Sequence, residues 1–364
     1  MDRLAGGGAG RGVSRGGREG FVQDQGILEG YSLKLPTSGP ETRRLDRVSP
    51  HASAKPVKGA RRVLRGAARL LICAVVLLGG YGVVTDRLVT RADRRADRDA
   101  ETGILRGAEP RDLGPEDARG AVLFVHGFVG AGNNFAELPE RLAARGWRVR
   151  VMRLPGHGTT PRDLKEVRSD ELLAAVTAEF AALRKRHGQV ILIGHSMGGA
   201  LGIFAAAHSD VDGLVLGAPY FGVTYRRYYL LPAEVWTRLL RPIVPWFYKG
   251  KTFLQVNRKE AKDRIVSYAW APARGLLTLF DVGDRANQPE VLENVTCPVL
   301  MLHAPGDAAA SPEAAKRAFN AIASNDKRAV WLERSNHHIF WDFEQADVFE
   351  TVEDFVGFPP PKAQ

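Results

Sequence analysis

The sequence predicts an α/β fold with a mostly parallel central sheet. From about residue 102 onward, short apolar runs alternate with amphipathic stretches, as strands and helices alternate in such folds. Several of these runs are apolar at consecutive positions, which is typical of strands that are buried on both faces. The chain has 364 residues, of which 45% are hydrophobic, so it is long enough to bury a large core.

Six of the apolar runs are predicted as strands, and they are AVLFVHG (121–127), WRVRVMRL (147–154), QVILIGH (189–195), DGLVLGAP (212–219), CPVLMLHA (297–304) and KRAVWLE (327–333). Three stretches between them are predicted as helices, and they are 135–146, 169–188 and 198–209. A final helix is expected after residue 338. In the helix at 169–188, Leu172, Val176, Phe180 and Leu183 recur at the spacing of one buried face.

A long interval at residues 221–296 separates two successive predicted strands. It is longer than a single crossover helix requires, so we expect a cap insertion there, built of helices. We expect its aromatic side chains to pack mainly on one another, with a minority lining an opening above the sheet. These aromatic residues are Tyr225, Tyr228, Tyr229, Trp236, Trp246, Phe247, Tyr248, Phe253, Tyr268, Trp270 and Phe280.

The N-terminal part of the chain differs in composition from the rest. Residues 1–62 are rich in Gly, Arg, Ser and Pro without a sustained apolar period, so we predict a disordered arm. Nine of the ten net positive charges fall in residues 1–100, so the basic pI of 9.7 belongs to this region. We therefore predict no nucleic-acid-binding surface on the folded domain. Contact of the arm with anionic lipid or nucleic acid stays open as an alternative.

Residues 63–85 are predicted as a single-pass membrane anchor, followed by a charged linker at 86–101. The run LLICAVVLLGGYGVVT (70–85) has no charge and is slightly shorter than the roughly 20 residues that cross a bilayer. Extension back to Val63, with Arg65 and Arg69 reaching the headgroups, completes a span. A cleaved signal peptide is the alternative, but no small-x-small cleavage site follows. Six basic residues before the span and five after it favour an extracytoplasmic domain by a small margin.

The chemistry of the chain is indicated by Gly194-His195-Ser196-Met197-Gly198, which fits the pattern G-x-S-x-G. In this pattern the serine occupies a sharp turn between a buried strand and a helix, and glycines allow the close backbone approach. The hydroxyl is then held out of the sheet at a helix N-terminus, where negative charge is favoured. The sequence therefore predicts Ser196 as a nucleophile.

Acyl transfer also requires amide donors for the oxyanion of the tetrahedral intermediate. The segment Phe124-Val125-His126-Gly127-Phe128 ends the first predicted strand of the domain. We predict that the backbone N–H groups of Phe128 and Met197 form this oxyanion hole. His126 follows a buried strand directly, so we expect it to shape the loop and not to act as a base.

A serine hydroxyl needs an imidazole to accept its proton and a carboxylate to orient that imidazole. His337 and His338 follow the last predicted strand, and Asp307 follows the one before it. The chain order serine, acid, histidine is the order that accompanies this turn. Asp342 is a reserve acid, although it lies close to the histidines along the chain. The alternative for Asp307 is a structural position before the helix that starts near Ser311.

Residues 118–358 resemble the α/β-hydrolase superfamily, and specifically bacterial carboxylesterases and monoacylglycerol lipases. The resemblance rests on HGF (126–128), LPGHGTTPRDL (154–164), GHSMGG (194–199), HAPGD (303–307) and SNHHIFWD (335–342). It implies an α/β-hydrolase fold with a helical cap, with Ser196 as nucleophile, Asp307 as orienting acid and His337 as base. It also implies Phe128 and Met197 as oxyanion donors. Ala304 stands where the family often has glycine.

The expected function is hydrolysis of carboxylic esters with apolar acyl chains, of the monoacylglycerol or lysophospholipid type. The same three residues also support thioester or amide cleavage, as in aminopeptidases of this fold. An aspartate nucleophile is disfavoured because Ser196 occupies that position. A non-catalytic, membrane-tethered binding protein is the alternative from another class. We expect no metal or organic cofactor, since GAGNN (130–134) lacks the lysine of a phosphate-binding loop and no H-E-x-x-H occurs. The oligomeric state is not indicated.

Overall fold

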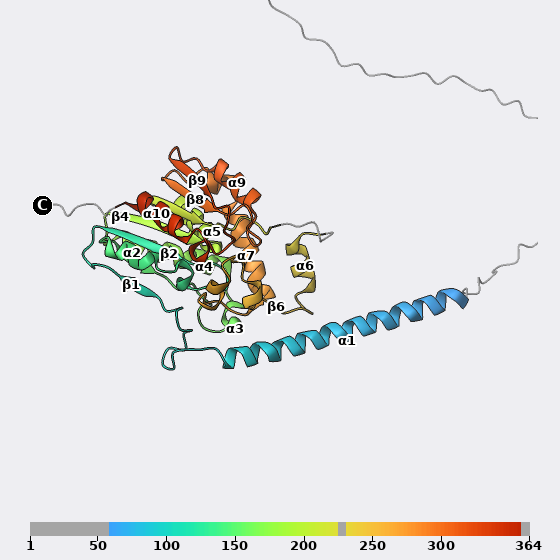
Figure 1. Ribbon diagram of the computed structural model, residues 1–364. Helices are drawn as coiled ribbons and strands as arrows, with labels where there is room; N and C mark the ends of the chain where they lie inside the picture. Colours follow the sequence, from blue (N-terminus) through green and yellow to red (C-terminus); the bar gives the residue numbers. More distant parts are fainter. Residues whose placement is uncertain (1–57, 225–230, 358–364) are drawn as a thin grey trace, which may run out of the picture. The chain divides into compact units, whose positions relative to one another are not determined.

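The computed structural model describes residues 58–224 and 231–357, and its centre is a twisted sheet (Figure 1). The strand order is β1-β3-β2-β4-β5-β8-β9, and only β1 runs antiparallel to its neighbour. All six predicted strands are present, so the predicted mostly parallel α/β sheet is confirmed. The strands are β1 (Arg111–Leu113), β2 (Gly120–Val125), β3 (Arg148–Val151), β4 (Gln189–His195), β5 (Gly213–Gly217), β8 (Val299–His303) and β9 (Lys327–Trp331).

Helices cover both faces of the sheet. Leu123 and Val125 of β2 face one core with α4, α5 and α9, whereas Val122 and Phe124 face a second core with α2 and α10. The stripe predicted at Leu172, Val176, Phe180 and Leu183 is buried in the first core. The helices are α2 (Leu138–Ala144), α3 (Pro161–Leu164), α4 (Ser169–Arg184), α5 (Met197–His208), α9 (Pro312–Ala321) and α10 (Gln345–Val356).

The expected insertion lies between β5 and β8, and it is not purely helical. Besides α6 (Ala233–Leu240), α7 (Ala273–Ala286) and α8 (Pro289–Leu292), it holds a two-stranded antiparallel hairpin of β6 (Trp246–Tyr248) and β7 (Trp270–Pro272). Some of its aromatic rings pack on one another as expected, since Tyr248 contacts Trp270 and Phe253. Three further aromatic residues of the prediction, Tyr225, Tyr228 and Tyr229, lie outside the described residues.

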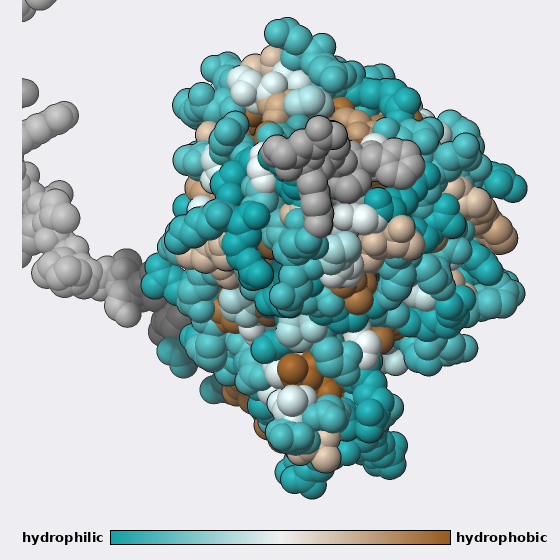
Figure 2. All heavy atoms as spheres, turned by 90° about the vertical axis from the view of Figure 1, so that its left-hand side faces the viewer, coloured by the Kyte–Doolittle hydropathy of each residue, from teal (hydrophilic) through white to brown (hydrophobic). Residues whose placement is uncertain are grey.

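A single long helix, α1 (Lys58–Arg94), precedes the domain, and it is longer than the expected span. It begins inside the stretch predicted as a disordered arm, whose remainder lies outside the described residues. It also continues through the first half of the expected linker. Its apolar side chains are largely exposed, with Leu77 exposed by 73%. By contrast, the face of the domain in Figure 2 is mainly hydrophilic, with small separate apolar patches. Among the described helices, α1 alone is long and apolar enough to cross a membrane.

The C-terminal half of α1 contacts the insertion and the segment after β3. The Tyr81 hydroxyl donates a hydrogen bond to the backbone oxygen of Trp246 at 3.1 Å, and Asp86 pairs with Arg162 at 3.0 Å. Val89 is fully buried against Trp246 and Trp270. These contacts attach α1 to the domain at β6.

Candidate active site

Ser196 stands at the turn between β4 and α5 with φ 55° and ψ −120°, a backbone conformation that disfavours side chains. The flanking glycines make this turn possible. A Cβ atom on Gly194 would lie 2.3 Å from the carbonyl oxygen of Gly198, and one on Gly198 would lie 1.8 Å from that of Val125. The predicted strand–turn–helix geometry is therefore present, and it holds Ser196 at the carboxyl edge of the sheet.

The structure brings Ser196, His337 and Asp307 together at this edge. His337 Nε2 lies 2.9 Å from Ser196 Oγ, and His337 Nδ1 lies 2.8 Å from Asp307 Oδ2. All three residues are buried. Asp307 comes from the loop after β8, and His337 from the loop after β9. The arrangement lets the imidazole accept the serine proton while the carboxylate fixes its Nδ1–H.

Both oxygens of the Asp307 carboxylate have partners. Oδ1 accepts hydrogen bonds from the backbone N–H groups of Ala309 and Ala310 at 2.7 and 2.9 Å, while Oδ2 faces His337. Burial would raise the pKa of Asp307, but the nearby imidazoles of His337 and His303 and these hydrogen bonds hold it below its usual value. The carboxylate is therefore ionised at neutral pH.

The N-terminus of α9 is capped by a different residue. The Ser311 hydroxyl accepts the backbone N–H of Ala314 at 3.2 Å, so Asp307 does not serve as this cap.

The two predicted oxyanion donors border Ser196. Met197 is the first residue of α5, and a Cβ atom on Gly127, next to Phe128, would lie 2.9 Å from Ser196 Cβ. Within residues 58–224 and 231–357, the backbone N–H groups of Phe128 and Met197 have no hydrogen-bond acceptor. Two free donors beside the serine hydroxyl are what an oxyanion hole requires.

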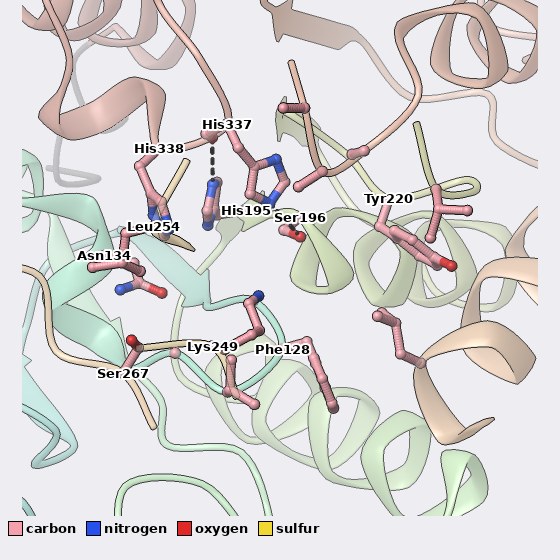
Figure 3. Close-up of a pocket in the computed structure, with 18 of the residues that line it drawn as sticks. Phe128, Asn134, His195, Ser196, Tyr220, Lys249, Leu254, Ser267, His337 and His338 are labelled. Carbon is pink, nitrogen blue, oxygen red and sulfur yellow. Dashed lines mark hydrogen bonds between the residues drawn. The ribbon is translucent and has the colours of Figure 1, made fainter. Parts of the chain in front are cut away.

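Two further histidines, His195 and His126, form hydrogen bonds to backbone groups of the loops that border the site. His195 Nε2 donates a hydrogen bond to the backbone oxygen of His337 at 3.0 Å, which Figure 3 shows as a dashed line. His126 accepts the N–H of Leu154 at 3.1 Å and donates to the oxygen of Gly127, so it shapes the loop as expected. Burial lowers the pKa of His126 and of His195 to about 3, so both rings are neutral. The sequence prediction missed the role of His195, although it occupies the variable position before the serine.

Asp342 does not contact the imidazole of His337, so its reserve role is not supported by the geometry. Its carboxylate accepts backbone N–H groups from Asn257, Arg258 and Asn336 at 2.8–2.9 Å, and from Phe343 at 3.0 Å. This carboxylate ties the insertion to the loop that carries His337. It acts on the backbone, where a sequence pattern gives no signal.

A cavity of about 460 Å³ opens beside Ser196 (Figure 3). On one side, Tyr220 packs against α7, whose Leu276 and Leu279 also line the cavity. On the other side of Ser196, Figure 3 shows Asn134, Lys249, Ser267 and His338. The expectation that aromatic residues of the insertion line the opening is wrong for the described residues, because the insertion contributes aliphatic and polar side chains. The described residues contain no cluster of three or more metal-ligating side chains.

Comparison with known proteins relates the chain to lipolytic enzymes. The family described as "Serine aminopeptidase, S33" matches residues 116–345. A thermostable monoacylglycerol lipase of Bacillus sp. (strain H-257) is 28% identical to this chain, and the match covers 70% of this chain and 96% of the lipase. A carboxylesterase of Bacillus subtilis (strain 168) is 23% identical, and the match covers 65% of this chain and 92% of the carboxylesterase.

Solved structures agree with these matches. A metagenome-derived lipolytic enzyme is 25% identical with a TM-score of 0.62, covering 70% of this chain and 98% of its own. A Paleococcus ferrophilus monoacylglycerol lipase is 22% identical with a TM-score of 0.58, and the match covers 68% of this chain and 97% of the lipase. The α/β-hydrolase fold implied by the sequence is therefore confirmed.

Proposed function

Because the chain belongs to the serine aminopeptidase S33 family, we propose that it is a serine hydrolase that cleaves carboxylic esters of apolar acyl chains. The observation that carries this proposal is the continuous relay from Ser196 through His337 to Asp307, with both distances below 3 Å. The names of its relatives, a monoacylglycerol lipase and a carboxylesterase, support an ester as the substrate.

In the proposed reaction, Ser196 Oγ attacks the ester carbonyl while His337 Nε2 takes its proton. Asp307 keeps the His337 Nδ1–H oriented and stabilises the imidazolium. The N–H groups of Phe128 and Met197 bind the oxyanion. His337 then protonates the leaving alcohol, and water hydrolyses the acyl-enzyme by the same route in reverse.

The lining of the cavity favours an ester over a peptide substrate. Tyr220, Leu276 and Leu279 supply an apolar wall that suits an acyl chain. No Asp or Glu lines the cavity within the described part of the chain, so nothing there offers an ion pair to a free amino terminus. Monoacylglycerols and lysophospholipids each carry one acyl chain and one polar alcohol part, so both match a cavity with one apolar wall and one polar side.

The same proposal places the enzyme at a membrane, with α1 as a single-pass anchor and the domain on the extracytoplasmic side. Exposed apolar side chains along α1 support this, as does the attachment of its C-terminal half to β6. Alkaline carbonate extraction of membranes from expressing cells should leave the full chain in the pellet. Recovery in the supernatant, or a mature N-terminus after residue 85, would contradict an uncleaved anchor.

Catalysis is tested with the full chain in detergent, using a fluorophosphonate probe and p-nitrophenyl esters of increasing acyl length. We expect covalent labelling of Ser196 and turnover that rises with chain length up to the size of the cavity. Ser196→Ala should lose both. Absence of labelling and of turnover at every chain length in the folded parent protein would refute the proposal.

A further inference from the structure

Lys249 is a charged residue in the cavity that the proposed reaction does not use. It follows β6, where its backbone N–H donates to the oxygen of Ala269 at 2.7 Å. Its side chain points into the cavity below His195 and Ser196 (Figure 3). Within the described ranges, its ammonium group has neither an ion pair nor a hydrogen bond. The nearby Lys251, by contrast, is exposed and pairs with Asp263.

An unpaired ammonium inside a cavity is energetically unfavourable. Burial lowers the pKa of Lys249, and the negative charge of Asp307 opposes this shift only in part. A partner of opposite charge would offset the desolvation cost, whereas an uncharged acyl chain would add to it. An apolar side chain at position 249 would suit an acyl pocket better. The charge of Lys249 therefore indicates that the ligand, and not the protein, supplies a negatively charged group at this position.

Two other polar side chains on the same side of Ser196 also lack partners. Neither the Ser267 hydroxyl nor the His338 imidazole has a hydrogen bond within the described residues, and His338 Nδ1 is buried. Burial lowers the pKa of His338 well below its usual value, and the neighbouring imidazoles of His195 and His337 contribute a smaller part of this shift. The His338 imidazole is therefore neutral and carries one N–H. Lys249, Ser267 and His338 thus offer three donors.

We propose that Lys249, Ser267 and His338 bind a phosphate group carried by the alcohol part of the ester, which makes the substrate an anionic lysophospholipid. This inference rests on the proposed function. The acyl chain then lies against Tyr220 and α7, with the scissile carbonyl at Ser196. The phosphate lies on the opposite side, and His337 between them protonates the departing alcohol.

The test compares 1-octanoylglycerol 3-phosphate with neutral 1-octanoylglycerol, both below their micellar concentrations, on the full chain in detergent. The measured quantity is the ratio of kcat/KM for the phosphate ester to that for the neutral ester. We expect Lys249→Met to lower this ratio at least about 10-fold, which corresponds to about 1.4 kcal/mol. Lys249→Arg keeps the positive charge and should retain most of the parental ratio. Lys251→Met is the control, since it removes a nearby surface charge, and should leave the ratio unchanged.

A second measurement is independent of turnover. Ser196→Ala should bind the phosphate ester in calorimetry, and the double variant with Lys249→Met should bind it at least about 10-fold more weakly. If the parent hydrolyses no ester but this difference in binding persists, the proposed function fails and the phosphate site stands. An unchanged ratio and unchanged binding in Lys249→Met overturn the inference, as does an equal loss in Lys251→Met.

Discussion

Replacing Asp307 with asparagine tests the relay, because the structure dictates how the new amide is oriented. The Oδ1 position receives two backbone N–H groups, from Ala309 and Ala310, and only an oxygen accepts them. A flipped amide would leave both donors without an acceptor, at about 1–3 kcal/mol each. The amide NH₂ of the variant therefore faces His337 Nδ1.

This orientation reverses the tautomer of the imidazole. His337 Nδ1 becomes an acceptor, so the proton moves to Nε2, which faces Ser196 Oγ at 2.9 Å. A protonated Nε2 cannot act as the base. We expect kcat to fall about 10⁴-fold, the size of effect that the wrong tautomer produces in such triads. This fall corresponds to about 5 kcal/mol in activation free energy. The fold should persist because the backbone contacts at the Oδ1 position remain.

The assay measures kcat for p-nitrophenyl butyrate and the rate of fluorophosphonate labelling, together with the melting temperature. Asp263→Asn is the control, because this exposed carboxylate pairs with Lys251 and lies outside the cavity lining. We expect it to match the parent protein. If Asp307→Asn keeps more than about a tenth of the parental kcat and melts normally, the deduced tautomer and the proposed role of Asp307 are both wrong.

Two further predictions concern stability. Gly198→Ala should prevent folding or abolish turnover, because its Cβ would lie 1.8 Å from the oxygen of Val125, whereas Gly188→Ala, with 3.8 Å to its nearest atom, should be tolerated in a solubility and activity screen. Glu353→Gln should lower the free energy of unfolding by about 1 kcal/mol at pH 7, since it weakens the pairing of this buried carboxylate with Arg141, whose half-exposed guanidinium is screened by solvent, and with Arg145. The pairing with Arg141 lowers the pKa of Glu353 in the folded protein below its usual value of 4.5, so in urea titrations the difference between parent and variant should be full above pH 4.5 and should be lost as the pH falls through the lower pKa of the folded state.

The sequence predicted the part of the site that depends on local geometry and on strand ends. The glycine spacing around Ser196 is a local requirement of the turn, so it is visible in the sequence. Asp307 and His337 were predictable because the carboxyl ends of parallel strands meet at one edge of a sheet. The strands themselves are short runs of consecutive apolar residues, which are typical of strands that are buried on both faces of a sheet.

The remaining features depend on contacts between segments that are distant in the sequence. β1 and β6 have three residues each, too few to show a period. Asp342 holds backbone groups, which carry no residue signature. Lys249 enters the cavity only because β6 pairs with β7, in a register that joins Trp246 to Pro272. These features follow from tertiary packing, which overrides local preference.

The segment from Trp246 to Arg258 joins three parts of the molecule. Its first residue receives the hydrogen bond from Tyr81 of α1, and its last donates its backbone N–H to Asp342 in the loop after His337. Lys249 lies between them, in the wall of the cavity. A freely flexible linker after the apolar span would leave these parts independent of one another. Because α1 instead stays helical to Arg94 and contacts this segment, anchoring of α1 in a membrane, as proposed above, would restrict where the cavity opens relative to the bilayer.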